Sequence, residues 1–231
     1  MSFSEQTNLH KFDDLEQQSQ HLADAVAQIL QQQLTQSNRA TLAVSGGSTP
    51  KRLFELLSKI DLQWQHVTIT LVDDRWLPKD HDDSNQKLLE KNLLQNYAAK
   101  ANFIPLYQTG LSAFDASDKV NAIFSEVALP FDVVLLGMGN DGHTASLFPC
   151  SEQITEGLTT SNTYLATAPT SAPHHRMSLS ANAIDNAKHL FLQLKGADKQ
   201  ATLNKALSGD DQQKMPIRRF LTNDITVLWC P

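Results

Sequence analysis

Residues 131–146, FDVVLLGMGNDGHTAS, decide the fold of this chain. The first part, Phe131–Leu136, is an unbroken apolar run with two adjacent valines, which predicts a strand buried on both faces. Glycines follow at Gly137, Gly139 and Gly142, and glycine lets a backbone turn sharply and approach a ligand closely. A buried strand that ends in a glycine loop is typical of the carboxyl edge of a parallel sheet, where ligands bind.

The polar residues of this loop are Asn140, Asp141 and His143. They can titrate or form hydrogen bonds, so the loop is a candidate site at the end of the strand. The alternative is an Asx-type turn that carries a surface histidine.

Working outward, apolar runs alternate with amphipathic segments. Strands are predicted at Thr41–Val44, Val67–Val72, Phe131–Leu136, Tyr164–Ala168, Met177–Ser180, Lys188–Leu194 and Ile225–Trp229. Helices are predicted from Phe12 to Gln33, from Pro50, from Ser84 to Leu94, within Ala113–Val127, from Thr144 to Phe148 and from Asp198 to Leu207, whereas Glu152–Ser161 reads as a connection. The alternation predicts a single α/β domain over residues 1–231, with a mainly parallel twisted sheet and helices on both faces, in a modified Rossmann-like arrangement.

Composition narrows the possible partners. The chain has 231 residues, 41% of them hydrophobic and 19% charged, which is enough for a normal core, and its net charge of -6 argues against a nucleic-acid partner. Two distant cysteines, Cys150 and Cys230, form neither a disulfide framework nor a zinc quartet. The start, MSFSEQTNLH, lacks the pattern of a signal peptide, and no apolar run is long enough for a membrane span. We therefore expect a cytoplasmic protein without a membrane partner, either a monomer or a small homo-oligomer.

A second glycine loop, Ser45-Gly46-Gly47-Ser48-Thr49, follows the first predicted strand. Pro50 then opens a helix, for which Thr49 or Ser48 is the expected cap. Free N–H groups and the positive end of the helix dipole attract anions at such a junction. The loop is neither a Walker A sequence nor GxGxxG. Its alternative is an ordinary loop, but the helix that follows favours a phosphate site.

The strand Val67–Val72 ends in Asp73, Asp74 and Arg75, with Trp76 next. Charges at the end of a buried strand are unfavourable unless they are paired or used. Asp73, Asp74 and Arg75 form either a surface ion pair over Trp76 or part of a functional site. The sequence leaves open which of these three residues binds a substrate. The charged loop 79–83, KDHDD, is placed to fold over a substrate.

Four segments together resemble the 6-phosphogluconolactonase family, within the wider glucosamine-6-phosphate deaminase/isomerase-like fold. They are LAVSGGSTPKRLFELL (42–57), VDDRWLP with DSN (72–78 and 83–85), LGMGNDGHTASLFP (136–149) and KGADK (195–199). The third is the most specific, and the segments span most of the chain. The resemblance implies hydrolysis of 6-phospho-D-glucono-1,5-lactone to 6-phosphogluconate in the pentose phosphate pathway, without a metal or other cofactor.

Lactone hydrolysis needs a nucleophilic water, a stabilised oxyanion and a proton for the leaving oxygen. His143 is the expected general base, because imidazole titrates near neutral pH. Asp141 is expected to orient its ring, as the acid does in a catalytic triad. The N–H groups near Gly139 and Gly142 are expected at the oxyanion, and Arg75 is expected to hold a substrate oxygen or the phosphate.

The phosphate is expected on the second glycine loop, with help from Lys199 and Arg176. The segment KGADK resembles the family's phosphate-binding lysine region, in which we favour Lys199 over Lys195. The full set of candidate catalytic residues is Asp73, Arg75, Asp141 and His143. The candidate substrate-binding residues are Ser45, Gly46, Gly47, Ser48, Thr49, Gly139, Asn140, Gly142, Arg176 and Lys199. His174 and His175 are either substrate contacts or ordinary loop histidines, and Ser146 is expected at a helix start. A metal site formed by Asp73, Asp74 and His143 is an alternative, but its spacing matches no recognised ligand set.

Two rival functions remain. One is a sugar-phosphate deaminase or isomerase, in which Asp73 matches the position of the C2 base. The deaminase pattern carries a glutamate after the DGH segment, whereas this chain has Leu147-Phe148-Pro149. The other rival is a non-catalytic sugar-phosphate sensor, which would need a DNA-binding segment that the acidic N-terminal helix does not supply.

Overall fold

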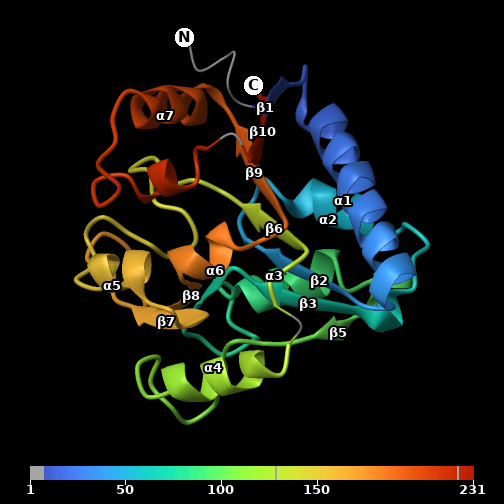
Figure 1. Cartoon of the computed structure of the whole chain (residues 1–231), viewed down its shortest axis with the longest axis horizontal. Helices are drawn as coiled ribbons and strands as arrows, with labels where there is room; N and C mark the ends of the chain where they lie inside the picture. Colours follow the sequence, from blue (N-terminus) through green and yellow to red (C-terminus); the bar gives the residue numbers. More distant parts are fainter. Residues whose placement is uncertain (1–7, 128, 223) are drawn as a thin grey trace.

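A computed structural model describes residues 8–127, 129–222 and 224–231. Its main sheet has seven parallel strands in the order β1-β10-β9-β6-β2-β3-β5 (Figure 1). The strands are β1 (Asn8–Lys11), β2 (Ala40–Val44), β3 (Val67–Leu71), β5 (Asn102–Phe103), β6 (Val133–Leu136), β9 (His189–Lys195) and β10 (Ile225–Cys230). The predicted parallel α/β architecture is therefore confirmed, with β1 and β5 as further edge strands.

Helices connect and cover these strands. They are α1 (Leu15–Ser37), α2 (Lys51–Leu57), α3 (Asn85–Asn92), α4 (Ser117–Ser125), α5 (Ile154–Thr159), α6 (Ala181–Asp185) and α7 (Ala197–Leu207), with 3-10 turns at Trp64–His66, Asn96–Lys100 and Pro216–Arg219. In Figure 1, α1 and α2 lie on one side of the main sheet and α7 lies on the other. Coverage of both faces explains why β2 and β6 are buried at every position.

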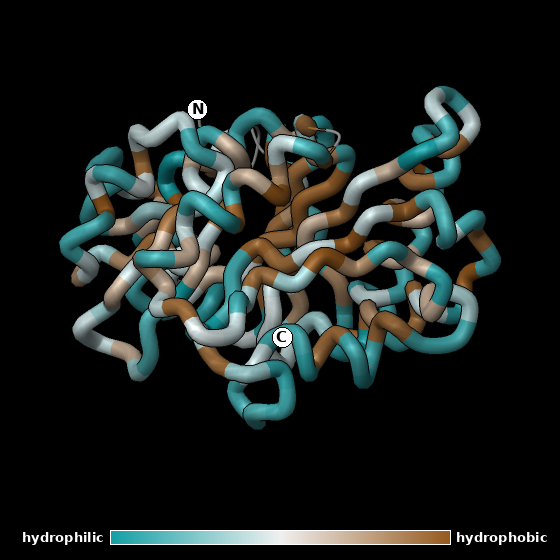
Figure 2. The backbone as a smooth tube through the Cα atoms, turned by 90° about the horizontal axis from the view of Figure 1, so that it is seen from below, coloured by the Kyte–Doolittle hydropathy of each residue, from teal (hydrophilic) through white to brown (hydrophobic). Residues whose placement is uncertain are grey.

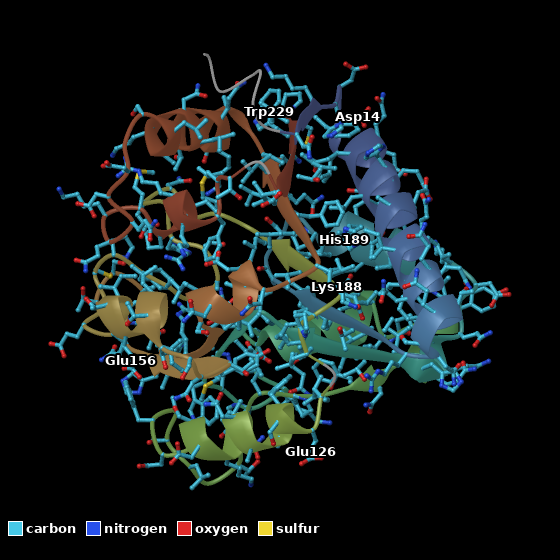
Figure 3. All side chains as sticks on the ribbon, in the orientation of Figure 1. Asp14, Glu126, Glu156, Lys188, His189 and Trp229 are labelled. Atoms are coloured by element: carbon cyan, nitrogen blue, oxygen red, sulfur yellow. The ribbon has the colours of Figure 1, made fainter. Side chains whose placement is uncertain are left out.

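The apolar segments gather in the middle of the molecule, where the brown strands of Figure 2 are surrounded by polar turns. One hydrophobic core extends from Leu22 on α1 to Leu228 on β10. Asp14 lies at the start of α1 (Figure 3), where its carboxylate accepts a hydrogen bond of 2.9 Å from the N–H of Gln17. This cap satisfies an N–H group that the first turn leaves without a helical partner.

A second sheet was not predicted. It has three antiparallel strands in the order β4-β8-β7, namely β4 (Asp73–Arg75), β8 (Arg176–Leu179) and β7 (Tyr164–Thr167). The alternation in Met177–Ser180 predicted a half-exposed strand, but every residue of β8 is buried. The prediction was wrong because β8 is the central strand of this sheet and packs against the rest of the protein.

Two further local predictions were wrong. Residues 144–148 form no helix, because Ala145 adopts a left-handed backbone with φ of 51° and Thr144 pairs with Leu147 in an isolated bridge. The polar connection at 152–161 contains the short helix α5, whose Leu158 packs into the core. In both places tertiary contacts outweigh local propensity.

The predicted helix boundaries differ at several ends. The first helix continues past its glutamines to Ser37, because Asn38 ends it in a left-handed conformation. Neither α2 nor α7 has a side-chain cap, so the caps predicted at Thr49, Ser48 and Asp198 are absent.

The order of strands identifies the place where a site is expected. From β2 the chain proceeds to β3 on one side, whereas β6 and β9 lie on the other side. Loops that leave neighbouring parallel strands in opposite directions open a crevice at their carboxyl ends. Among the described residues, the helices are all too short or too polar to cross a membrane.

Candidate active site

A cleft of about 770 Å³ lies at this crevice, between the carboxyl ends of β2, β6 and β9 and the small sheet. The predicted residues that line it are Ser45, Gly46, Gly47, Ser48, Thr49, Asp73, Arg75, Gly139, Asn140, Asp141, His143, Arg176 and Lys199. Segments distant in sequence therefore meet around one cavity. Gly142 is the exception, because it is buried outside the lining.

His143 and Asp141 form a close pair in the loop after β6. The Nδ1 of His143 lies 2.6 Å from Oδ1 of Asp141, and the same oxygen accepts the backbone N–H of His143 at 3.1 Å. Burial opposes ionisation of Asp141, but the hydrogen bond and charge of His143 outweigh it and lower the pKa of this carboxyl. An ionised Asp141 holds the proton of the ring on Nδ1, which leaves Nε2 as the basic nitrogen.

Two glycine N–H groups of this loop form hydrogen bonds within the loop itself. The N–H of Gly139 donates to the carbonyl of His143 at 2.8 Å, and the N–H of Gly142 donates to the carbonyl of Gly139 at 3.0 Å. Both groups therefore serve the turn itself and are not available to an oxyanion in this conformation.

Close packing explains why glycine occupies both positions. A Cβ on Gly139 would lie 2.1 Å from the imidazole of His143, so the absence of a side chain lets the ring lie against the backbone. Gly142 has φ of +82°, and a Cβ there would lie 2.7 Å from the side chain of Met215. Gly139 thus shapes the site directly, whereas Gly142 shapes the turn behind it.

The loop after β2 has the features of an anion site. The N–H groups of residues 46–49 have no acceptor within the described parts of the chain. The Oγ of Ser45 is buried and also lacks a partner there. A Cβ on Gly46 would lie 1.9 Å from Oδ1 of Asn85, and Gly47 has φ of +110°. Unused donors in a glycine turn beside a helix start are suited to bind a phosphate group.

Two lysines face the same cavity. Lys199, on the first turn of α7, donates to Oδ1 of Asn140. Lys195, at the end of β9, also lines the cleft. The preference for Lys199 over Lys195 therefore stays a prediction, because both residues line the cleft.

The adjacent acids Asp73 and Asp74 have different surroundings. Successive residues of a strand point to opposite faces, and only Asp73 lines the cleft. Asp74 is 2% exposed and accepts the backbone N–H groups of Arg75, Asn85 and Gln86 at 2.8, 2.7 and 3.1 Å. Burial raises the pKa of Asp74 to about 6, against the effect of these donors. Asp74 thus holds the start of α3, whereas Asp73 faces the cleft.

Arg75 and Arg176 lie opposite each other in the register of β4 and β8. The Nη1 of Arg75 donates to the carbonyl of Asp83 at 2.5 Å, so the loop 79–83 is tied to the edge of the cleft. Arg176 is only 5% exposed, and its Nε has no partner among the described residues. Burial lowers the pKa of this guanidinium while the charge of Asp73 raises it. An unpaired buried donor beside a cavity favours an anionic or polar ligand.

Several residues in or beside the cleft were missed or left open by sequence reasoning. Ser146 is buried and donates to Oδ2 of Asp73, rather than starting a helix. Phe148 stacks on His143, and Gln193 lines the cleft from β9. Of the two loop histidines, His174 lines the cleft, whereas His175 packs edge-on against Phe114 at 5.5 Å. Phe148 and Gln193 lie in the LFP and KHLFLQL segments, where nothing local distinguished them from core positions.

Within the described residues no three histidine, cysteine or acidic side chains are grouped closely enough to hold a metal ion. Asp73, Asp74 and His143 therefore do not form the alternative metal site.

Comparisons with known proteins agree with this geometry. The family model for glucosamine-6-phosphate isomerases and 6-phosphogluconolactonase matches residues 13–229. The chain is 41% identical over 217 residues to the 6-phosphogluconolactonase of Pseudomonas aeruginosa, covering 93% of this chain and 91% of that protein. It is 38% identical over 229 residues to the 6-phosphogluconolactonase of Rhizobium meliloti, covering 97% of this chain and 99% of that protein. The crystal structure of a 6-phosphogluconolactonase from Shewanella baltica superposes on this chain with a TM-score of 0.96 at 42% identity. The match covers 97% of this chain and 98% of that one. The chain therefore belongs to the family of glucosamine-6-phosphate isomerases and 6-phosphogluconolactonases.

Proposed function

We propose that this protein hydrolyses 6-phospho-D-glucono-1,5-lactone to 6-phosphogluconate in the pentose phosphate pathway. The relatives named 6-phosphogluconolactonase match nearly the whole chain, which supports this reaction. The single observation that carries the mechanism is the pairing of His143 with Asp141 at 2.6 Å inside a cleft that also contains a glycine loop with unused N–H groups.

In the proposed reaction, Nε2 of His143 removes a proton from a water molecule as its oxygen attacks the lactone carbonyl. Asp141 stabilises the imidazolium that forms. The tetrahedral intermediate then expels the ring oxygen, which takes the proton from His143. The products are the open-chain carboxylic acid, which ionises, and a free hydroxyl group.

Binding of the two ends of the substrate follows from the distribution of donors. The phosphate is assigned to Ser45–Thr49 and Lys199, where free N–H groups and an ammonium group face the cleft. Because the N–H groups of Gly139 and Gly142 are used by their own turn, the guanidinium groups of Arg75 and Arg176 are further candidates for the developing oxyanion.

The direct test is a coupled assay with freshly made 6-phosphogluconolactone, in which a dehydrogenase reports 6-phosphogluconate and spontaneous hydrolysis is subtracted. A rate proportional to protein concentration is expected. Sugar-phosphate binding without any turnover would instead favour the sensor.

The deaminase or isomerase is the second candidate, because Asp73 faces the cleft where a C2 base would act. Phe148 stacks on His143, however, and an aromatic ring neither accepts a proton nor carries charge. We expect no ammonia from glucosamine 6-phosphate and no exchange of the C2 hydrogen of glucose 6-phosphate with deuterated water. Either reaction at a rate that rivals lactone hydrolysis would reverse the choice.

The proposal also includes the organisation of the protein. We propose one domain over residues 1–231, cytoplasmic residence, and a monomer or small homo-oligomer without a nucleic-acid partner. Light scattering after gel filtration measures the oligomeric state.

A further inference from the structure

Phe148 contacts two polar side chains of the cleft at once. Its ring stacks on the imidazole of His143, with centroids 3.9 Å apart and planes inclined by 25°. The Cζ of Arg176 lies 5.3 Å from the centroid of the same ring. Phe148 is only 5% exposed, so the contact is held by the surrounding protein.

The other contacts of His143 leave one motion unrestrained. The hydrogen bond from Nδ1 to Asp141 fixes the position of one ring atom. The backbone of Gly139 limits the approach of the ring on its Cε1 and Nδ1 edge. Neither contact prevents the ring from tilting about the Nδ1 position, and such a tilt would displace Nε2. A stacked aromatic face prevents this tilt, because tilting separates the two rings.

We propose that Phe148 is a positioning residue that holds the imidazole of His143 in the orientation required for water activation. This inference rests on the hydrolysis proposed above. The π face of Phe148 also favours the imidazolium that forms when His143 takes the proton. Arg176 depends less on Phe148, because it is anchored in β8 and its Nη2 donates to the carbonyl of Pro173 at 3.1 Å.

Nuclear magnetic resonance of the ligand-free protein tests the contact without using activity. The His143 ring signals, assigned by their loss in His143→Ala, are expected upfield in the wild type because of the Phe148 ring current. They are expected to move downfield in Phe148→Leu, which keeps an apolar side chain but no aromatic face, and to stay upfield in Phe148→Tyr.

Kinetics then test the consequence of the contact. Phe148→Leu is expected to lower kcat by about 10- to 100-fold, as misplacement of a reacting group does, with much less change in KM. Phe148→Tyr should recover most of kcat. Phe124→Leu is the matched control, because Phe124 is a buried ring that packs on Phe131 and Tyr164 away from the cleft. It should lower Tm but leave kcat and the His143 signals unchanged.

A folded Phe148→Leu protein with wild-type ring signals and wild-type kcat would overturn the inference. So would a Phe148→Tyr protein that keeps the upfield signals but loses as much kcat as Phe148→Leu. If the wild type itself does not hydrolyse the lactone, the proposed function fails, and the ring signals alone then decide whether Phe148 orients His143.

Discussion

The two walls of the cleft are built in different ways. On the main-sheet wall, each group follows its own strand directly: the loop Ser45–Thr49 follows β2, the His143 loop follows β6 and Lys199 follows β9. On the small-sheet wall, Asp73 and Arg75 lie opposite Ser178 and Arg176 only because β4 pairs with β8, which is distant in sequence. The first wall is therefore a set of local motifs, and the second is a product of long-range pairing.

The walls also differ in burial. Asp141 and Lys195 on the main-sheet wall are exposed to solvent, whereas Asp73 is 8% and Arg176 is 5% exposed. Buried charges require partners. Asp73 accepts a hydrogen bond from Ser146 and Nη2 of Arg176 donates to the carbonyl of Pro173, whereas Nε of Arg176 has no partner among the described residues. The comparison suggests that proton transfer belongs to the main-sheet wall and rigid orientation of polar groups belongs to the small sheet.

The largest expected effect is at the main-sheet wall. His143→Ala should lower kcat by about 10²–10⁴, the usual contribution of a general base. The fold should be unchanged, because the ring contributes little to the core. The coupled lactone assay and a thermal melt measure both properties. A folded His143→Ala variant with near-normal turnover would remove His143 from the mechanism.

Asp141→Asn should also lower kcat, without a comparable loss of phosphate affinity.

The next effect separates a glycine that packs against the His143 ring from one with open space at its Cβ position. Gly139→Ala places a methyl group 2.1 Å from the His143 ring, so the ring must move. We expect kcat to fall by roughly 10²-fold, as for other small displacements of a reacting group. Gly137→Ala is the matched control, because nothing lies within 4 Å of its Cβ position. Equal kcat values for the two variants would contradict the packing argument.

A smaller effect is expected at the proposed phosphate site on the main-sheet wall. Lys199→Ala should raise KM, because a charge-assisted hydrogen bond contributes roughly 1.5–3 kcal/mol. Inhibition by inorganic phosphate and by 6-phosphogluconate should weaken in parallel. Lys195→Ala, in the other lysine of the cleft, should change these constants less. If KM and product inhibition in Lys199→Ala match the wild type, the phosphate lies elsewhere.

The smallest effect on turnover is expected at Asp74, behind the small-sheet wall. Burial raises its pKa in the folded protein from 3.8 to about 6. Between these values the folded state binds more protons than the unfolded state, so the stabilisation is present below about pH 4 and is lost as the pH rises toward 6. The free energy of unfolding of the wild type should fall relative to Asp74→Asn over this range, by at most roughly 3 kcal/mol.

Urea titrations of both proteins at several pH values between 4 and 7 measure this difference. Parallel stability profiles would show that Asp74 keeps an ordinary pKa. Asp73→Asn provides the contrast, because Asp73 lines the cleft and its change should appear in the lactone assay more than in stability.

Much of this protein is determined by the sequence alone. The apolar runs at β2, β3, β6, β9 and β10 predicted the parallel sheet, because a strand buried on both faces must be apolar along its length. The loops that follow β2 and β6 were recognised as candidate sites for a related reason. Glycine and polar residues immediately after a buried parallel strand are typical of a ligand site at the carboxyl end of the sheet. Their neighbours in space could be inferred from the rule that parallel strands end at one edge.

Only the tertiary structure decided how the other groups are used. The small sheet depends on pairing between Asp73 and Ser178, which no local pattern records. The separate tasks of Asp73 and Asp74 depend on which face of β4 meets α3. The use of the Gly139 N–H within its own turn and the stacking of Phe148 on His143 depend on the path of residues 137–148 in space. Each of these contacts is set by the close packing of segments that are remote or irregular in sequence, and local propensity carries no information about such packing.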